Sequence, residues 1–118
     1  MATFKIDQGA SFSLAILMSV QPKMGFRDGR PTGQQETNKD GIPKWVVQVS
    51  VADRETGSAD LIKVTVTMPQ NPAEVAQIGM PIHFDGLGIG LMNGKPYFVA
   101  SGVVSAMASA SNGRSKGE

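Results

Sequence analysis

Two segments near the middle of the chain alternate between apolar and polar residues with a period of two. They are Trp45–Val51, WVVQVSV, and Leu61–Met68, LIKVTVTM. Successive side chains of a β-strand point to opposite faces of a sheet, so this period predicts two strands, each with one apolar face. The connection between them, ADRETGSAD, is short and contains one glycine, which is typical of a hairpin. We therefore expect two adjacent antiparallel strands.

A strand is also expected early in the chain, over Ser11–Val20. Its strongly apolar face carries Phe12, Leu14, Ile16 and Met18. The apolar run Leu14–Met18 is too short to cross a bilayer, and no cleavage site of the signal-peptide kind follows it. We therefore interpret the segment as a strand and not as a targeting signal.

One short helix is expected within Pro69–Gly79, PQNPAEVAQIG. Asn71 can cap its N-terminus, Pro72 suits the first turn, and Gly79 can end it. We therefore expect a helix of about two turns between Asn71 and Gly79.

Two further strands are expected after this helix. In Pro81–Leu87, PIHFDGL, apolar and polar residues alternate, and the glycines at positions 86, 88 and 90 indicate a bulged or strongly curved strand. Asn93-Gly94 is typical of a hairpin turn, and Tyr97–Val104 then reads as the last strand.

The order of these elements predicts an all-β fold with one short helix. Five strands with a helix between the third and fourth is the order of the OB-fold, a Greek-key barrel. We expect a five-stranded OB-fold barrel with a long loop between strands 1 and 2. Another small β-barrel or an open sandwich is the alternative. A chain of 118 residues suffices for one domain, expected over residues 1–108, and the small polar residues 109–118 are expected to form a disordered tail.

The long loop is Met24–Lys44, MGFRDGRPTGQQETNKDGIPK. It contains four glycines and two prolines and has no apolar run. A structureless loop of about 20 residues is unusual in a compact domain and is usually functional or disordered. We expect a mobile loop that can close on a ligand.

Basic and aromatic residues are interleaved around this loop. The formal net charge is only +1, so the distribution of charge, and not its sum, indicates a nucleic-acid site. Proteins that bind single strands combine a positive groove with aromatic stacking platforms, and OB-folds place both on strands 2 and 3 and on loops 1–2 and 4–5. The residues expected to bind nucleic acid are Lys23, Phe26, Arg27, Arg30, Lys39, Lys44, Trp45, Gln48, Lys63, Thr65, Lys95 and Tyr97.

The aromatic residues allow more than one interpretation. Trp45 shares its face with three valines, which favours packing in the core over stacking. Tyr97 and Phe98 lie on opposite faces of one strand, so one points inward and the other outward. Phe26 has no apolar neighbours at strand spacing, which makes it the candidate for an exposed ring.

Few residues point to catalysis or to a metal. The chain has no cysteine and one histidine, His83, which shares a strand face with Asp85. Such a pair can orient a base, but no serine elbow accompanies it, and an exposed strand face is the simpler interpretation. Zinc sites need three or four convergent ligands. We therefore expect a non-enzyme without cofactor or metal, located in the bacterial or host cytoplasm.

Two stretches of the chain resemble small proteins encoded on actinobacterial plasmids, integrative elements and phages. The first matches at Asp40, Gly41, Pro43, Trp45, Val47 and Val49, and the second at Gly79, Ile82, Phe84, Gly86 and Leu87. The resemblance spans roughly residues 11–104 and implies an OB-like fold and a role in replication, recombination or transfer, similar to single-stranded DNA-binding proteins. The matching residues belong mostly to turns and core, so they argue for fold more than for function. Unlike general single-stranded DNA-binding proteins, the chain has no long acidic C-terminal tail.

Two functions are compatible with these observations. The first is a non-catalytic protein that binds single-stranded DNA, in preference to RNA, by electrostatic and stacking contacts. The second is an OB-like protein–protein interaction module that serves replication or transfer. Because small OB proteins often associate through strand edges, a homo-oligomer (dimer or tetramer) is expected, and no membrane partner.

Overall fold

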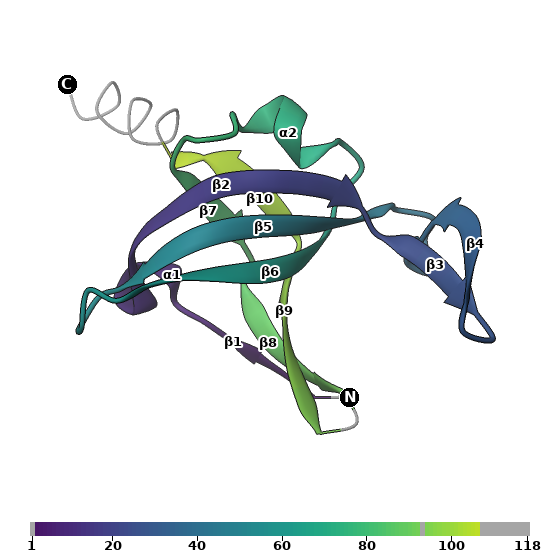
Figure 1. The fold of residues 1–118 in the computed structure, drawn as a ribbon, viewed down its shortest axis with the longest axis horizontal. Helices are drawn as coiled ribbons and strands as arrows, with labels where there is room; N and C mark the ends of the chain where they lie inside the picture. The colour runs from purple at the N-terminus through teal and green to yellow at the C-terminus, as the bar shows by residue number, and fades with distance from the viewer. Residues whose placement is uncertain (1, 93, 107–118) are drawn as a thin grey trace.

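A computed structural model describes residues 2–92 and 94–106 of the chain (Figure 1). This part consists mainly of strands with two one-turn helices, which confirms the all-β expectation. The elements are β1 (Ala2–Lys5), α1 (Gln8–Ser11), β2 (Phe12–Pro22), β3 (Met24–Arg27), β4 (Arg30–Gln35), β5 (Lys44–Asp53), β6 (Ala59–Thr67), α2 (Pro72–Val75), β7 (Ile82–Asp85), β8 (Gly88–Met92), β9 (Lys95–Ala100) and β10 (Gly102–Ser105). Neither helix is long or apolar enough to cross a membrane.

Six of the strands form one curved sheet in the order β1-β8-β9-β6-β5-β2 (Figure 1). β2, β5 and β6 are an antiparallel meander, and β8 and β9 form an antiparallel hairpin. β6 and β9 pair in parallel, which joins the meander to the hairpin. β7 and β10 form a separate two-stranded sheet, and an isolated bridge between Ile16 of β2 and Pro81 connects the two sheets.

The core lies inside the curve of the sheet. Its fully buried residues include Val47 and Val49 of β5 and Val64 and Val66 of β6, on the faces that the alternation predicts. Ile82 and Phe84 of β7 and Val103 of β10 complete it from the other sheet. The expected hairpin between β5 and β6 is confirmed by nine antiparallel residue pairs, from Lys44↔Thr67 to Ala52↔Ala59.

The strand β2 turns the opposite face to the core from the one expected to be strongly apolar. Ala15 and Leu17 are buried, whereas Leu14 and Met18 are 49% and 44% exposed. The register gives the reason: Leu17 pairs with Val49 of β5, and paired residues share one face of a sheet. The valine face of β5 therefore decides which residues of β2 point inward.

The segment Met24–Lys44 is not the structureless loop that its composition predicts. β3 and β4 pair as an antiparallel hairpin that projects beyond the end of β2 (Figure 1), and we call this hairpin the β3–β4 arm. Its turn is Asp28-Gly29, with φ of 54° and 76°. Two positive φ values in a two-residue turn are what the twist of a hairpin requires, and Asp-Gly is a favoured pair for it.

Other boundaries also differ from the expectations. α2 has one turn and not two; Asn71 caps it as predicted, its side chain accepting a hydrogen bond from the Ala73 N–H. The last predicted strand is divided at Ser101 into β9 and β10, because the chain leaves one sheet there and joins the other. β1 and α1 were not expected at all. The turn residue Asn93 and the tail 109–118 lie outside the described residues.

Candidate nucleic-acid interface

A groove of about 610 Å³ opens on the outer side of the sheet, at the base of the β3–β4 arm. It is bounded by β6, β9 and β1. The residues that line it are Thr3, Lys23, Glu36, Lys44, Thr65, Thr67, Lys95, Pro96, Tyr97 and Val99. Three of these side chains are lysines and one is a carboxylate, so the groove is cationic although the whole chain is nearly neutral.

Strand alternation places the floor of the groove on the outer face of the sheet. Val64 and Val66 of β6 are buried, so Thr65 between them points the other way. Thr65 pairs with Val99 of β9, and paired residues share a face. Thr67, two residues after Thr65, carries a second hydroxyl on the same face.

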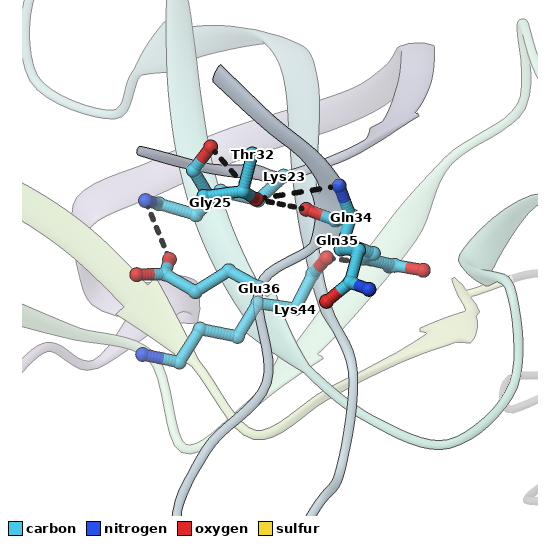
Figure 2. A network of polar contacts seen from close by, with 7 residues as sticks. All are labelled: Lys23, Gly25, Thr32, Gln34, Gln35, Glu36 and Lys44. Atoms are coloured by element: carbon cyan, nitrogen blue, oxygen red, sulfur yellow. Dashed lines mark hydrogen bonds and ion pairs between the residues drawn. The ribbon is translucent and has the colours of Figure 1, made fainter. Parts of the chain in front are cut away.

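Backbone hydrogen bonds at the base of the β3–β4 arm connect three charged residues, whose side chains are drawn in Figure 2. The Lys23 N–H donates to the Lys44 carbonyl at 3.0 Å, the Glu36 N–H to the Lys23 carbonyl at 2.7 Å, and the Lys44 N–H to the Glu36 carbonyl at 2.8 Å. The Gln35 side chain adds a 2.7 Å hydrogen bond from Nε2 to the Lys44 carbonyl. The three charged side chains therefore start from adjoining, hydrogen-bonded backbone positions and all reach the groove.

One of the lysines is already paired. Lys23 Nζ lies 2.6 Å from Glu36 Oε2, and each side chain is 36% exposed. Within residues 2–92 and 94–106, Lys44 and Lys95 form no ion pair. These two cations are available to a phosphate without displacing a carboxylate.

Tyr97 contributes an aromatic ring whose position depends on a glycine. Tyr97 of β9 pairs with Gly90 of β8. A Cβ atom built on Gly90 would lie 2.5 Å from the ring Cζ, closer than atoms can approach, so the ring lies over the bare backbone of Gly90. The half-buried ring is held flat against β8 and lines the groove.

The groove brings together five of the twelve residues expected to bind nucleic acid: Lys23, Lys44, Thr65, Lys95 and Tyr97. Thr67 and Val99 were not predicted, although the same alternation that selects Thr65 and Tyr97 could have found them. Thr3 gave no usable signal, because β1 is short and takes its place only by pairing with β8. Glu36 also lines the groove and was not among the predicted residues.

Trp45 is a predicted site residue that does not line the groove. Its side chain is partly buried and packs against the core, and its Nε1–H donates to the Met68 carbonyl at 3.0 Å. The ring therefore packs against the core, as the shared face with the valines favours. The cause is the shared face with Val47, which puts Trp45 on the inward side of β5.

Gln48 and Lys63 lie on the outer face but outside the groove lining. They pair across β5 and β6, and Gln48 Oε1 accepts a hydrogen bond of 3.2 Å from the Ser19 hydroxyl. Lys63 is exposed and shares its strand face with Thr65, two residues along. The polar surface therefore continues from the groove along the meander.

The remaining predicted residues belong to the arm and to the turn after it. Phe26 is 68% exposed, which confirms the expected exposed ring. Arg30 is exposed at the start of β4, and Arg27 pairs with it through the backbone. Lys39 is exposed in a turn in which Asn38 Oδ1 accepts from two backbone N–H groups. Phe26, Arg30 and Lys39 do not line the groove.

The described residues hold few groups suited to other chemistry. His83 and Asp85 are both exposed on β7, on the opposite side of the strand from the buried Ile82 and Phe84. Among the residues that the structure describes, no group of three His, Cys, Asp or Glu residues could hold a metal ion. The pKa of Asp53 is lowered by hydrogen bonds from the backbone N–H groups of the turn that follows it.

Comparisons with known proteins do not assign the chain to a family. No protein-family model, no curated protein and no solved structure matches it. The function has therefore to be inferred from the residues that form the groove.

Proposed function

We propose that this chain binds single-stranded nucleic acid, DNA in preference to RNA, without catalysis, and that the strand lies in the groove. The observation that carries the proposal is the composition of the groove. Lys23, Lys44 and Lys95 enter it from three separate segments of the chain, next to the ring of Tyr97. Cations beside an aromatic platform are the combination that single-strand binders use.

Each group has a definite part in this binding mode. The ammonium groups attract phosphates, and the hydroxyls of Thr65 and Thr67 can donate hydrogen bonds to phosphate oxygens. The flat ring of Tyr97 offers a face to a base, and a stacked base contributes roughly 1–3 kcal/mol. A base must be unpaired to stack on a side chain, which favours a single strand over a duplex.

We also propose that the sheets form an OB-type Greek-key barrel. The supporting features are the β2-β5-β6 meander, the parallel pairing of β6 with β9, and the position of α2 between β6 and β7. If β7–β8 and β9–β10 are each counted as one bent strand, they make a five-stranded barrel with β2, β5 and β6, and β1 is an additional edge strand beside β8. The bridge from Ile16 to Pro81 would close the barrel. The groove would then lie where OB-folds bind oligonucleotides.

A role in replication, recombination or transfer of a mobile element or phage rests on the sequence resemblance alone. Binding that follows the backbone and stacks bases without contacts to their edges suits such a role, because any sequence must be accommodated.

Titration of a fluorescent oligothymidylate at two salt concentrations tests the function. We expect binding at low salt, with log K falling by about 0.7 per decade of salt for each phosphate neutralised. The double variant Lys44→Gln/Lys95→Gln should bind more weakly and with a shallower slope. Lys39→Gln removes a cation outside the groove and is the control. No binding at low salt, or binding without salt dependence, would rule out the proposal.

An interaction module remains the second candidate because of one apolar stripe. Leu14, Met18 and Leu61 are 49%, 44% and 49% exposed, and Ile16 pairs with Ser50, which in turn pairs with Leu61. We propose that the chain forms a homo-oligomer through this stripe. Sedimentation of the wild type and of Leu14→Ser/Leu61→Ser would test it: a dimer or tetramer that persists unchanged in the variant excludes the stripe as the interface.

A further inference from the structure

Inside the groove, the positive charge of Lys23 is neutralised by the carboxylate of Glu36. Its Nζ contacts Glu36 Oε2 at 2.6 Å, and both residues line the groove. The Oε2 atom is hidden from solvent and accepts no hydrogen bond from the described residues, so Lys23 is the group that balances its charge. Figure 2 shows the carboxylate between the side chains of Lys23 and Lys44.

The pair differs from an ordinary surface ion pair because backbone hydrogen bonds connect Glu36 to the segments of both Lys23 and Lys44. Exposed ion pairs contribute little, because two long side chains must be ordered to form them. Here the Glu36 N–H donates to the Lys23 carbonyl at 2.7 Å, and the Lys44 N–H donates to the Glu36 carbonyl at 2.8 Å. The backbone keeps the carboxylate next to Lys23, and part of the ordering is done before the side chains meet.

We propose that Glu36 is a built-in competitor of phosphate for Lys23. The inference rests on the proposed function and concerns how tightly the groove binds a strand. In the free protein the groove offers two cations, Lys44 and Lys95. A phosphate gains Lys23 only by displacing the carboxylate, and it is repelled by that carboxylate as it approaches. Glu36 therefore limits both the affinity for a strand and the dependence of binding on salt.

The proposal predicts the salt slope as well as the affinity. Two available cations correspond to a slope of log K against log salt of about −1.4, and three correspond to about −2.1. Removing the negative charge of Glu36 should therefore steepen the slope by about 0.7. A unit charge about 4 Å from a phosphate in water changes the binding constant by about fivefold, so tighter binding of that order is expected.

The experiment compares Glu36→Gln with Glu55→Gln. Glu55 lies in the turn beyond the far end of β5, about 30 Å along the strand from Lys44, and its change adds the same net charge. We expect Glu36→Gln to bind an oligothymidylate about fivefold more tightly than the wild type at low salt. Glu55→Gln should remain within twofold. The gain should disappear when Lys23→Gln is added, because Lys23 is the cation that is released.

Thermal melting shows whether each variant is folded. Glu36→Ala keeps the same backbone hydrogen bonds and replaces Glu36→Gln if the latter melts at a lower temperature. Wild-type binding combined with equal affinities for the Glu36 and Glu55 variants would overturn the role of Glu36 and leave the proposed function standing. A gain that persists with Lys23→Gln would also overturn it. Absence of wild-type binding at low salt would overturn both.

Discussion

Gly90→Ala is expected to disable the stacking platform without breaking the fold. The added Cβ would lie 2.5 Å from Tyr97 Cζ, 2.6 Å from its hydroxyl oxygen and 2.9 Å from Cε1. Carbon atoms in contact are ordinarily about 3.5–4.0 Å apart, so the ring must move by about 1 Å or more. These atoms are the far end of a side chain that can rotate, and the backbone of β8 can stay in place. The methyl group therefore lifts the ring from the sheet.

The size of the effect follows from two separate terms. A ring forced away from its rotamer costs about 0.5–1.5 kcal/mol of stability. A lost base stack costs roughly 1–3 kcal/mol of binding free energy, which is about a fivefold to more than a hundredfold rise in Kd. Gly90→Ala should thus approach Tyr97→Ala in affinity while melting only slightly below the wild type.

Oligonucleotide titration combined with thermal melting checks this prediction. Gly102→Ala is the matched control, because its Cβ would meet only ordinary contacts, the nearest at 3.5 Å from Asp85 Cβ. We expect Gly102→Ala to bind like the wild type. If Tyr97→Ala binds weakly and Gly90→Ala binds normally, the ring can stack on a base without packing against the backbone of Gly90. If Tyr97→Ala itself binds normally, Tyr97 does not stack.

Three further changes probe the rest of the molecule. Leu17→Ala, in the core, should lower the free energy of unfolding by about 2–5 kcal/mol, whereas Leu14→Ala, at an exposed position, should change it by less than about 1 kcal/mol. Chemical denaturation measures both free energies. Equal losses would contradict the register of β2. Asp53→Asn should lower the melting temperature at pH 7 and lose this difference towards pH 3. The reason is that a carboxylate with a lowered pKa stabilises the fold above its usual pKa and loses that contribution as the pH falls; a difference independent of pH would contradict it. Replacing residues 24–35 with Asn-Gly should keep the fold, because Glu36 and Lys23 are already hydrogen-bonded neighbours. The affinity for a short oligonucleotide should stay unchanged. A loss of binding would place the arm in the interface.

The alternation of apolar and polar residues was sufficient to predict a strand and its inward face where the strand is buried on one side only. β5, β6 and β7 each have one apolar and one more polar face, so both their existence and the inward face were predictable. β2 failed this test because its more apolar face, with Leu14 and Met18, is the one that points away from the core. Its inward face is fixed by pairing with β5, and pairing is a property of the assembled sheet.

The β3–β4 arm was missed for a different reason. Its polar composition indicates a loop, but the turn Asp28-Gly29 between two short extended runs is a local hairpin signal. The signal was present in the sequence and was outweighed by composition. β1 had no comparable signal, because four residues at the start of the chain become a strand only when β8 is there to pair with them.

Strand faces predicted which residues line the groove better than the assumption of a loop that closes. Thr65 and Tyr97 were found because alternation puts them outside the core. In the long polar segment and its flanks, the residues that line the groove are Lys23, Glu36 and Lys44, which lie at the base of the arm. Phe26, in the arm itself, does not line it. The backbone bonds that join these three residues exist because the hairpin folds back on itself. The segment thus contributes its ends to the groove, and the paired arm between them holds those ends in place.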